Sequence, residues 1–582
     1  MPNALLVYPE HPPTYWGADY ALEISGVKAT HPPLGLLTVA AMFPSSYELR
    51  VVDMNVSALH DTEIEWADLV FTSTMITQHV SLRNVVERCN RAGVSVVAGG
   101  PHPTTFHEEI TGVDHFVLDE VEESFAEFFR DLEVDAAKRM YRERRKPDVT
   151  RTPVPRFDLI DIQNYATMSV QFSRGCPFDC EFCDIIKLYG RVPRTKPPEQ
   201  VVKEFESLYR LGWRGPVFLV DDNFIGNKRD ALKLLPVLAK WQKARGYPFT
   251  LATEASANLA LMDNMMDAMI EAGFDSVFVG IETPNPNALI KTKKRQNTDK
   301  TQKDFLYHAV RKIQRRGMQV QGGFILGLDG DDAGVFDAQI EFIQETGIPV
   351  APIYLLTVLK GTDLYERMES EGRLLETPLG TNAMLLNFKT ELEYSTLIEG
   401  YKRVIGTLYD PTLENYLSRC LTLFRHLKPV HHLRKPKSRA EVEIAFMSVR
   451  GRLSAKQLPA YSKFIGKVSK DYPRMLPDAI YLAAMGYHFE KITRQQIAIH
   501  DFLSFLRNEL ELFQKATSAH YSEGEIRSLS QTSLDRAQLH YQSVSGEFRY
   551  EVDGLDDALQ SFRSVVNART GAGDLAHSEN AL

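Results

Sequence analysis

Three cysteines lie close together in the run Cys176-Pro-Phe-Asp-Cys180-Glu-Phe-Cys183. Thiolates are the ligands of iron–sulfur clusters, and three of them on one loop can hold three irons of a four-iron cluster while the fourth iron stays open to another ligand. A closed structural zinc site needs four ligands, and no further Cys or His follows at motif spacing. The spacing therefore favours a four-iron cluster over a zinc site or plain buried thiols.

The loop that carries these cysteines follows the first strand of a repeated strand–helix pattern. Short apolar runs, separated by segments of helix length, indicate six strands at residues 169–172, 217–220, 249–253, 276–280, 320–326 and 352–358. Six such units predict a partial (β/α)6 barrel over residues 166–390. Barrels place functional side chains at the carboxyl ends of their strands, so we expect the chemistry there.

A second strand–helix alternation precedes the barrel and occupies residues 1–135. Its strands are expected at residues 5–8, 49–52, 69–72, 94–98 and 115–118, and its helices at 36–42, 82–91 and 122–132. This alternation predicts a doubly wound parallel sheet, the arrangement typical of α/β proteins. Such folds bind their ligands beyond the carboxyl ends of the strands.

The other segments have a different character. Residues 136–165 are charged and rich in proline, which predicts a linker. Residues 391–582 lose the strand signals and predict a helical C-terminal region, whose last residues, 571–582, are expected to be disordered. A basic stretch at 428–439, with His431 and His432, is expected to divide this region, and we favour a solvated linker over a lipid-binding patch for it.

Composition and charge exclude several classes of protein. The chain has 582 residues and a net charge of -9, so no global positive field exists to hold a nucleic-acid backbone, and we expect no nucleic-acid partner. No run of 18 apolar residues occurs and the first residues do not form a secretory signal, which predicts a cytoplasmic protein and leaves peripheral membrane contact open. The remaining cysteines, Cys89 and Cys420, lie in helical patterns where packing is expected, and five cysteines do not indicate a disulfide framework.

The cysteine loop resembles that of the radical S-adenosylmethionine (SAM) superfamily, which has this spacing and usually an aromatic residue before the third cysteine, here Phe182. Further motifs match in order along the expected barrel: V-D-D-N at 220–223, T-E-A-S at 253–256, G-I-E-T at 280–283 and G-F-I-L-G at 323–327. An acid at a strand end is more often solvated than functional, so the joint order carries the resemblance. It implies a SAM site formed by Phe182, Asp221, Asp222, Asn223, Glu254, Glu282, Gly323, Ile325 and Gly327.

Residues 1–135 resemble the cobalamin-binding domain that precedes this barrel in one large subclass of the superfamily. The resemblance implies cobalamin contacts from Tyr8, Pro33, Leu34, Gly35, Asp53, Thr74, Met75, Gly99, Gly100, His102 and Glu120. An ordinary strand-to-helix turn is the alternative explanation for Gly99 and Gly100. No D-x-H-x-x-G motif is present, so we expect no histidine on the lower face of the cobalamin, where Thr74 to Gln78 or, in principle, His102 would face the cobalt.

The resemblance covers residues 1–435 and is strongest to a group that includes the hopanoid C-2 methyltransferases. It implies a cobalamin-dependent radical SAM methyltransferase with a 4Fe-4S cluster, SAM and cobalamin, which adds a methyl group to an unactivated carbon of an apolar, hopanoid or lipid-like substrate. It also implies an electron donor such as flavodoxin or ferredoxin. Two alternatives stay open: oxidation, cyclisation or rearrangement without methyl transfer, and a non-catalytic cobalamin or SAM sensor.

Overall fold

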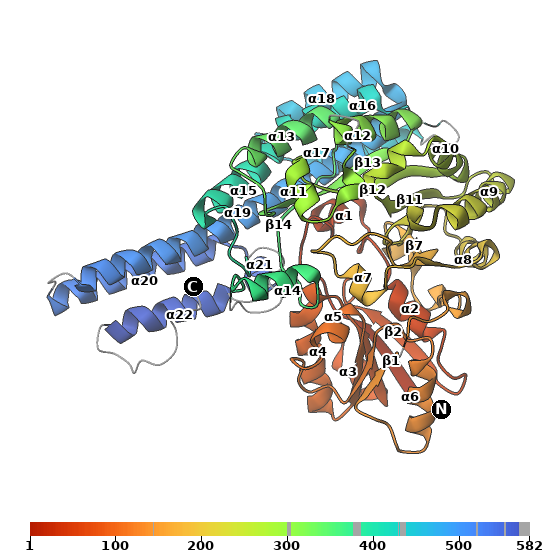
Figure 1. The fold of residues 1–582 in the computed structure, drawn as a ribbon, viewed down its shortest axis with the longest axis horizontal. Coiled ribbons are helices and arrows are strands. Elements are labelled where there is room, and N and C mark those ends of the chain that lie inside the picture. Colours follow the sequence, from red (N-terminus) through yellow and green to blue (C-terminus); the bar gives the residue numbers. More distant parts are fainter. Residues whose placement is uncertain are drawn as a thin grey trace.

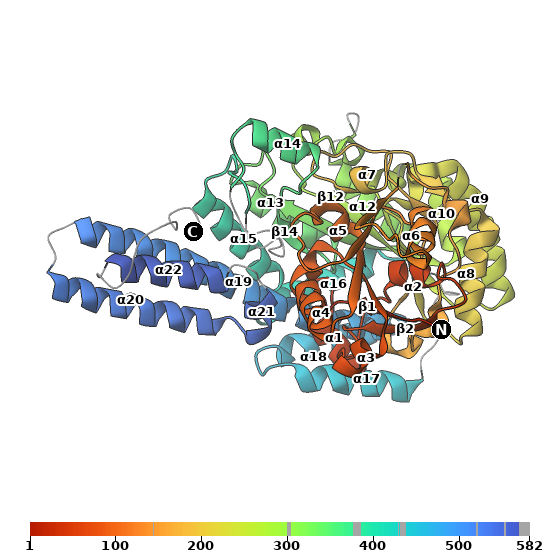
Figure 2. The same ribbon diagram turned by 90° about the horizontal axis from the view of Figure 1, so that it is seen from below.

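The structure is a computed structural model that describes residues 1–143, 145–299, 304–375, 386–428, 430, 438–518, 522–551 and 555–569. Two parallel sheets follow one another along the chain, the first in the lower part of Figure 1 and the second in its upper right part. A helical region follows them, and its longest helices project away from both sheets in Figures 1 and 2. No helix among the described residues is long and apolar enough to cross a membrane.

The first sheet has the strand order β2-β1-β3-β4-β5-β6, and all neighbouring strands are parallel. Its strands are β1 (Asn3–Tyr8), β2 (Glu48–Asp53), β3 (Leu69–Ser73), β4 (Ser95–Gly99), β5 (His115–Leu118) and β6 (Met140–Arg142). Leu5 and Val7 of β1 pack under α3 (Asp61–Trp66) and α4 (His79–Ala92), whereas Ala4 and Leu6 pack under α2 (Leu34–Ala40) and α6 (Ser124–Glu133). The sheet is therefore doubly wound, as predicted, and its order reverses between β1 and β3, where such folds bind ligands.

One strand of this sheet lies in the segment that the sequence predicts as a linker. β6 pairs in parallel with β5, from Phe116 with Met140 to Leu118 with Arg142. Only Tyr141 of β6 is buried, and its ring lies 5.4 Å from that of Phe128. Three residues with a single buried side chain show no alternation, so the periodicity of the sequence does not reveal this strand.

The second sheet has the order β14-β13-β12-β11-β10-β7, again with all neighbours parallel. Its strands are β7 (Met168–Val170), β10 (Pro216–Leu219), β11 (Thr250–Ala255), β12 (Phe274–Glu282), β13 (Gln319–Leu326) and β14 (Ile353–Leu355). The helices between them are α8 (Pro198–Arg210), α9 (Lys228–Ala244), α10 (Asp263–Ala272), α11 (Pro286–Lys291), α12 (Phe305–Arg316) and α13 (Val335–Thr346). The order follows the chain and ends at β7 and β14, which confirms a partial barrel of six units.

The strands of the barrel bury one face and leave the other partly exposed. Buried and half-buried residues alternate along the whole of β11 and β13. Phe324 belongs to the buried set, and its ring lies 6.1 Å from that of Phe342 on α13, so this set faces the helices. Glu254, Gly323 and Ile325 belong to the other set. The barrel interior therefore keeps accessible surface, on which a ligand can bind.

Helices dominate the chain beyond residue 390, as predicted. They are α15 (Tyr394–Leu408), α16 (Glu414–His426), α17 (Arg439–Arg452), α18 (Leu458–Asp471), α19 (Leu476–Ser518), α20 (Glu523–Ser543), α21 (Gly546–Glu551) and α22 (Leu555–Arg569), preceded by α14 (Asp363–Ser370). The first part of α19 packs against α15 and against α1 (Asp19–Ser25), and its far end forms an arm with α20 and α22 (Figure 1). The basic stretch around His431 and His432 and the predicted disordered tail lie outside the described residues.

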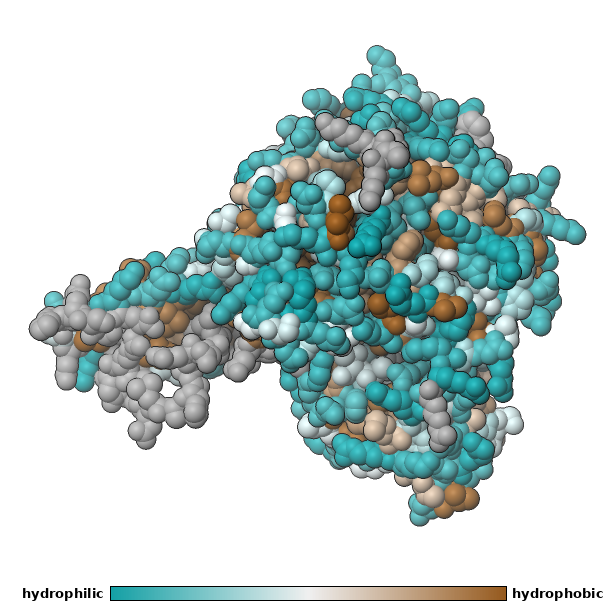
Figure 3. Space-filling view, in the orientation of Figure 1, coloured by the Kyte–Doolittle hydropathy of each residue, from teal (hydrophilic) through white to brown (hydrophobic). Residues whose placement is uncertain are grey.

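The surface contrasts with the apolar cores. The face of the molecule in Figure 3 is mainly hydrophilic, and apolar residues gather on it only in small groups.

Between α15 and α13, packing is so close that α15 needs a glycine: a Cβ at Gly400 would lie 2.2 Å from the ring of Phe336. This contact helps to seat the helical region on the barrel.

Gly400→Ala is expected to destabilise the protein by about 1–3 kcal/mol, because the added methyl group forces an overpacked contact with Phe336. Gly406→Ala is the matched control on the same helix, since its Cβ would meet only Ile497, at an ordinary 3.5 Å. The control should be neutral or stabilising, because alanine favours a helix over glycine by up to about 1 kcal/mol. Denaturant unfolding of both variants measures the difference, and equal stabilities would contradict the packing described for α15.

Candidate active site

The loop that carries the three cysteines is held at its start by a glycine and by a backbone hydrogen bond. The loop lies between β8 (Ser173–Arg174) and α7 (Ile185–Leu188), and β8 pairs with β9 (Arg194–Thr195) beyond it. Gly175 has a φ of +97°, and a Cβ there would lie 2.7 Å from the carbonyl oxygen of Gly190, so only glycine fits. The backbone N–H of Cys176 donates to that same carbonyl at 3.2 Å. The thiols of Cys176, Cys180 and Cys183 are free.

The thiols fit a cluster better than a single metal ion. Among the described residues, no three Cys, His or acidic side chains converge as the ligands of one ion must. A four-iron cluster has no such requirement, because each thiolate binds a different iron. The donor set of Cys176, Cys180 and Cys183 therefore favours the cluster over the zinc alternative.

Two side chains just beyond the end of β10 support the cysteine loop. Asp221 accepts hydrogen bonds from the backbone N–H groups of Phe172 and Ser173 at 2.8 and 3.0 Å and from the Ser173 hydroxyl at 2.9 Å. Asp222 accepts the N–H of Gly175 at 2.7 Å. Burial raises the pKa of Asp221 to about 7 and that of Asp222 to about 6. Both residues predicted as SAM contacts thus hold the backbone that leads into the cysteines.

Asn223 is placed differently from the two aspartates. Its Nδ2 donates to the Ser256 hydroxyl at 3.2 Å and lies 3.9 Å from the Sγ of Cys176. Its Oδ1 is buried and has no hydrogen-bond partner among the described residues. A buried acceptor left without a donor costs free energy, so a ligand that donates to this oxygen would be stabilised beside the cysteine.

A buried ion pair lies next to Phe182 of the cysteine loop. Lys294 Nζ is 2.5 Å from Glu282 Oε1, and the side chains expose 13% and 9% of their surface. The same Nζ lies 5.7 Å from the ring centroid of Phe182. Burial lowers the pKa of Lys294, but the charges of Glu282 and then of Cys180 outweigh it and raise that pKa above its usual value. Glu282 has a φ of +65°, a strained conformation for a residue other than glycine.

Lys294 and its neighbour Gln296 are not among the site residues predicted from the sequence. Gln296 Nε2 donates to the Sγ of Cys180 at 3.2 Å. Both residues lie beyond α11, twelve and fourteen positions after Glu282, where Lys294 precedes a short 3-10 helix (Arg295–Asn297) that contains Gln296. Position at a strand end does not identify them. The only available signal is that the buried acid at 282 needs a cation nearby.

Glu254 faces the barrel interior from β11 without a hydrogen-bond partner in the part of the chain that the structure describes. Burial, and then the charge of Asp222, raises the pKa of Glu254 to about 8. The carboxyl is therefore mostly neutral at pH 7 in the protein alone. A bound cation would ionise it, and SAM carries both a sulfonium and an ammonium group.

The predicted glycines make room in the interior. A Cβ at Gly323 would lie 2.7 Å from the ring of Phe278, and one at Gly280 would lie 2.7 Å from Oε1 of Glu282. Gly327 has a φ of +94°, which ends β13, and Ile325 is half-buried on the inward face. Larger residues at 280 and 323 would displace the side chains that line the site.

Residues predicted to contact cobalamin gather at the reversal point of the first sheet. Asp53 already has partners, since Oδ2 accepts from the Tyr165 hydroxyl at 3.0 Å and Oδ1 from Nδ2 of Asn55 at 2.7 Å. The Tyr8 hydroxyl shares a hydrogen bond of 3.1 Å with Nε2 of His11. These side chains shape the end of the sheet and leave few groups free.

Other predicted cobalamin contacts are available to a ligand. Thr74 Oγ1 is buried without a partner among the described residues, and Met75 beside it is 51% exposed. Pro33 is buried, Leu34 starts α2 and Gly35 is exposed. An orphaned hydroxyl beside an exposed apolar surface suits a large amphipathic cofactor at this edge.

Gly99 and Gly100 have a structural reason of their own. A Cβ at Gly99 would lie 2.7 Å from the carbonyl oxygen of Val117, and Gly100 has a φ of +92°. The turn into α5 (Pro101–Phe106) thus requires both, as in the ordinary strand-to-helix turn. His102 is buried, which lowers its pKa to about 4, and its Nδ1 has no partner among the described residues.

Glu120 joins the first sheet to the two-stranded sheet of β8 and β9, which flanks the cysteine loop. Its two carboxylate oxygens lie 2.9 Å from Arg174 and 2.7 Å from Arg194, which are the ends of β8 and the start of β9. Glu122 lies 2.7 Å from Arg174 as well. These side chains are nearly buried, so the pairs fix the edge of the first sheet against the cysteine loop. Glu120 is thus engaged within the protein, although it was predicted as a cobalamin contact.

Glu254→Gln is expected to change how stability depends on pH in the protein free of cluster and SAM. Because burial raises the pKa of Glu254 from 4.5 to about 8, the folded state holds this proton more tightly than the unfolded state. Its stabilisation is complete below pH 4.5 and is lost as the pH rises through 8. The variant should therefore gain on the order of a few kcal/mol over the unmodified protein between pH 5 and pH 8.

Melting curves across this pH range check the expectation, with the exposed Glu271→Gln on α10 as the matched control. A constant difference between Glu254→Gln and the unmodified protein at all pH values would show that Glu254 titrates normally.

Family comparisons assign three parts of the chain. Residues 170–343 match the radical SAM superfamily, and residues 24–129 match the B12 binding domain. Residues 362–500 match a domain of unknown function, DUF4070. The first match covers β10 to β13 of the second sheet, and the second covers β2 to β5 of the first sheet.

Curated relatives include several methyltransferases. The chain is 43% identical to an uncharacterized methyltransferase of Synechocystis sp., over 73% of this chain and 79% of that protein. It is 36% identical to the hopanoid C-2 methylase of Rhodopseudomonas palustris, over 64% of this chain and 71% of that protein. A bacteriochlorophyllide d C-12(1)-methyltransferase of Chlorobaculum tepidum is 25% identical over 59% of this chain and 74% of that protein.

Solved structures share the fold. The radical SAM methyltransferase TsrM from Kitasatospora setae, with cobalamin and a [4Fe-4S] cluster bound, has a TM-score of 0.54 at 16% identity and covers 83% of this chain and 99% of its own. The cobalamin-dependent radical enzyme OxsB with aqua-cobalamin has a TM-score of 0.56 at 12% identity, over 98% and 80%. With both cofactor-binding domains matched and relatives above 30% identity, the chain belongs to the cobalamin-binding radical SAM family and is a methyltransferase that uses SAM, a 4Fe-4S cluster and cobalamin.

Proposed function

We propose that this methyltransferase adds a methyl group to an unactivated carbon of an apolar, polycyclic or lipid-like substrate that binds inside the barrel. The observation that carries the proposal is the lining of the barrel interior. Its half-buried positions include Phe218 of β10, Phe278 of β12, Ile325 of β13 and Tyr354 of β14. Such a surface favours an apolar ligand, because a polar one would lose hydrogen bonds to water without regaining them.

Two residues from outside the barrel extend this lining. Trp16, from the segment before α1, is 45% exposed, and its ring lies 4.8 Å from that of Phe278. Tyr481 of α19 is 59% exposed, yet surrounding protein and then Asp275 raise its pKa. Aromatic side chains offer large apolar faces to a polycyclic ligand.

Some residues of the site would bind the cofactors, and others position the cysteine loop. When bound, the reduced cluster and SAM supply a radical that abstracts hydrogen, and cobalamin supplies the methyl group. Cys176, Cys180 and Cys183 hold the cluster, and Asp221 and Asp222 keep their loop in place. We assign contacts with SAM to the Oδ1 of Asn223, which is buried without a partner among the described residues, and to the carboxyls of Glu254 and Glu282. The apolar interior excludes water from the reacting carbon.

The names of the relatives support this class of substrate. Hopanoids and bacteriochlorophyllides, the substrates named for the relatives in Rhodopseudomonas palustris and Chlorobaculum tepidum, are both polycyclic. An electron donor of the flavodoxin or ferredoxin type would reduce the cluster. A lipid-like substrate would reach a cytoplasmic enzyme through peripheral contact with a membrane.

The triple variant Cys176→Ala, Cys180→Ala, Cys183→Ala is expected to lose all cluster iron after anaerobic reconstitution, because it lacks every thiolate of the loop. The double variant Cys89→Ala, Cys420→Ala is the control and should keep four irons per chain, since both thiols are buried away from the loop in α4 and α16. Iron analysis with an absorption spectrum measures both. Four irons in the triple variant would rule out this ligand set.

Cells that express the protein and receive SAM with a deuterated methyl group are expected to accumulate an apolar product that is heavier by one labelled methyl. Mass comparison of extracted lipids and pigments with those of cells that express the triple cysteine variant identifies it. If deoxyadenosine forms with an identified substrate but no label reaches the product, the reaction is an oxidation, cyclisation or rearrangement. A labelled product that is highly polar would contradict the proposed substrate class.

A further inference from the structure

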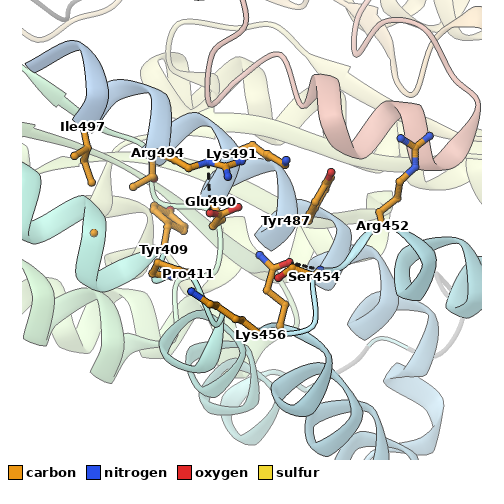
Figure 4. A pocket seen from close by; sticks show the side chains of 13 residues that line it. Tyr409, Pro411, Arg452, Ser454, Lys456, Tyr487, Glu490, Lys491, Arg494 and Ile497 are labelled. Atoms are coloured by element: carbon orange, nitrogen blue, oxygen red, sulfur yellow. Dashed lines mark hydrogen bonds and ion pairs between the residues drawn. The ribbon is translucent and has the colours of Figure 1, made fainter. Parts of the chain in front are cut away.

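We propose that a cleft in the helical region binds a ligand that combines a phosphate group with an apolar or aromatic part. The cleft lies between the end of α15, the start of α18 and the middle of α19, and its volume is about 490 Å³ (Figure 4). Sites for small molecules typically have volumes of about 300–1,000 Å³. None of the residues that line the cleft lies on a strand of the barrel, and the proposal does not depend on the nature of the methylated substrate.

The charges of the cleft are strongly unbalanced. Four cationic side chains line it, Arg452, Lys456, Lys491 and Arg494, against one carboxylate, Glu490. The chain as a whole carries a net charge of -9, so this local excess runs against the general trend. A concave surface lined by one sign of charge concentrates ions of the other sign.

The arginines are partly neutralised, whereas the lysines are not. Arg452 lies 3.2 Å from Glu23 of α1, and Nε of Arg494 lies 3.9 Å from Oε1 of Glu490. Within the described part of the chain, neither Lys456 nor Lys491 forms an ion pair; Nζ of Lys491 lies 5.4 Å from the centroid of the Tyr487 ring, and its charge acts on the Glu490 carboxylate. Two unpaired ammonium groups on one cleft match the charge of a phosphate monoester, about -1.5 to -2 at pH 7.

The backbone adds to this preference at one end of the cleft. Lys456 and Gln457 directly precede α18, a helix of 14 residues. The N-terminus of a helix carries a partial positive charge that favours anions. The charge of Lys456 and the dipole of α18 therefore act on the same part of the cleft.

The other wall of the cleft is apolar and rigid. It is formed by Pro411 and Ile497 over the buried ring of Tyr409, and Figure 4 shows all three on the side away from Arg452. The Tyr409 hydroxyl donates to the carbonyl of Ala351 at 2.8 Å, which fixes the ring. A free inorganic anion would leave this wall exposed to water. A phosphate ester with an apolar or aromatic group covers it, and such an ester can be a soluble metabolite or a phospholipid.

The test uses the full-length protein with its cofactors bound. Phenyl phosphate is the soluble probe and phenol its uncharged counterpart, and titration calorimetry measures their affinities. We expect phenyl phosphate to bind at least tenfold more tightly than phenol. The double variant Lys456→Gln, Lys491→Gln should bind phenyl phosphate at least tenfold more weakly than the unmodified protein.

The matched control is Lys463→Gln, Lys470→Gln, which removes two exposed charges from α18 outside the cleft and should leave the affinity unchanged. Melting temperatures of both variants exclude unfolding as the cause. Vesicles of phosphatidic acid, compared with those of phosphatidylcholine, distinguish the two sources, because a lipid ligand requires binding to the former that Lys456→Gln, Lys491→Gln abolishes. The proposal is overturned if neither phenyl phosphate nor phosphatidic acid vesicles bind, or if the two double variants bind these probes equally well.

Discussion

Arg174 carries the charge on which the arrangement of the two sheets depends. Its guanidinium lies against Glu120 and Glu122 at the edge of the first sheet, and the next residue, Gly175, is held by Asp222 from the second. Loss of one member of a buried ion pair typically costs about 3–5 kcal/mol, because the other charge stays buried without a partner. The cysteine loop is thus positioned by both sheets together, which sets where their two cofactors can meet.

Sequence reasoning locates both sheets and the ends of their strands, because long apolar runs and their spacing record burial directly. It fails where burial leaves no periodic record, as in β6, whose only buried residue is Tyr141. At the site, Asp221 and Asp222 are found by position, but their hydrogen bonds to the backbone of the cysteine loop are not, since a strand end shows only that an acid is present. Lys294 is missed because it does not lie at a strand end, and nothing in its local sequence shows that it pairs with Glu282.

The open side of the barrel needs other parts of the chain to close it. The sheet ends at β7 and β14, and the segment with Tyr15 and Trp16 packs against its inner face beside α19. Glycine at 323 keeps the neighbouring wall thin enough for Phe278 to reach this segment. The shape of the barrel interior therefore depends in part on residues far from the cysteine loop in the sequence.

The length of α19 has a mechanical consequence. With 43 residues the helix is about 65 Å long, and near its middle Thr493 forms a hydrogen bond of 2.7 Å with the hydroxyl of Tyr15. Its far end carries α20 and α22 outside the main body of the molecule. A rigid helix of this length can act as a lever. A force applied to its outer end would be transmitted to the helices that its first part contacts, α1 and α15. A load on the arm would therefore reach α1, next to the segment in which Trp16 lines the barrel interior.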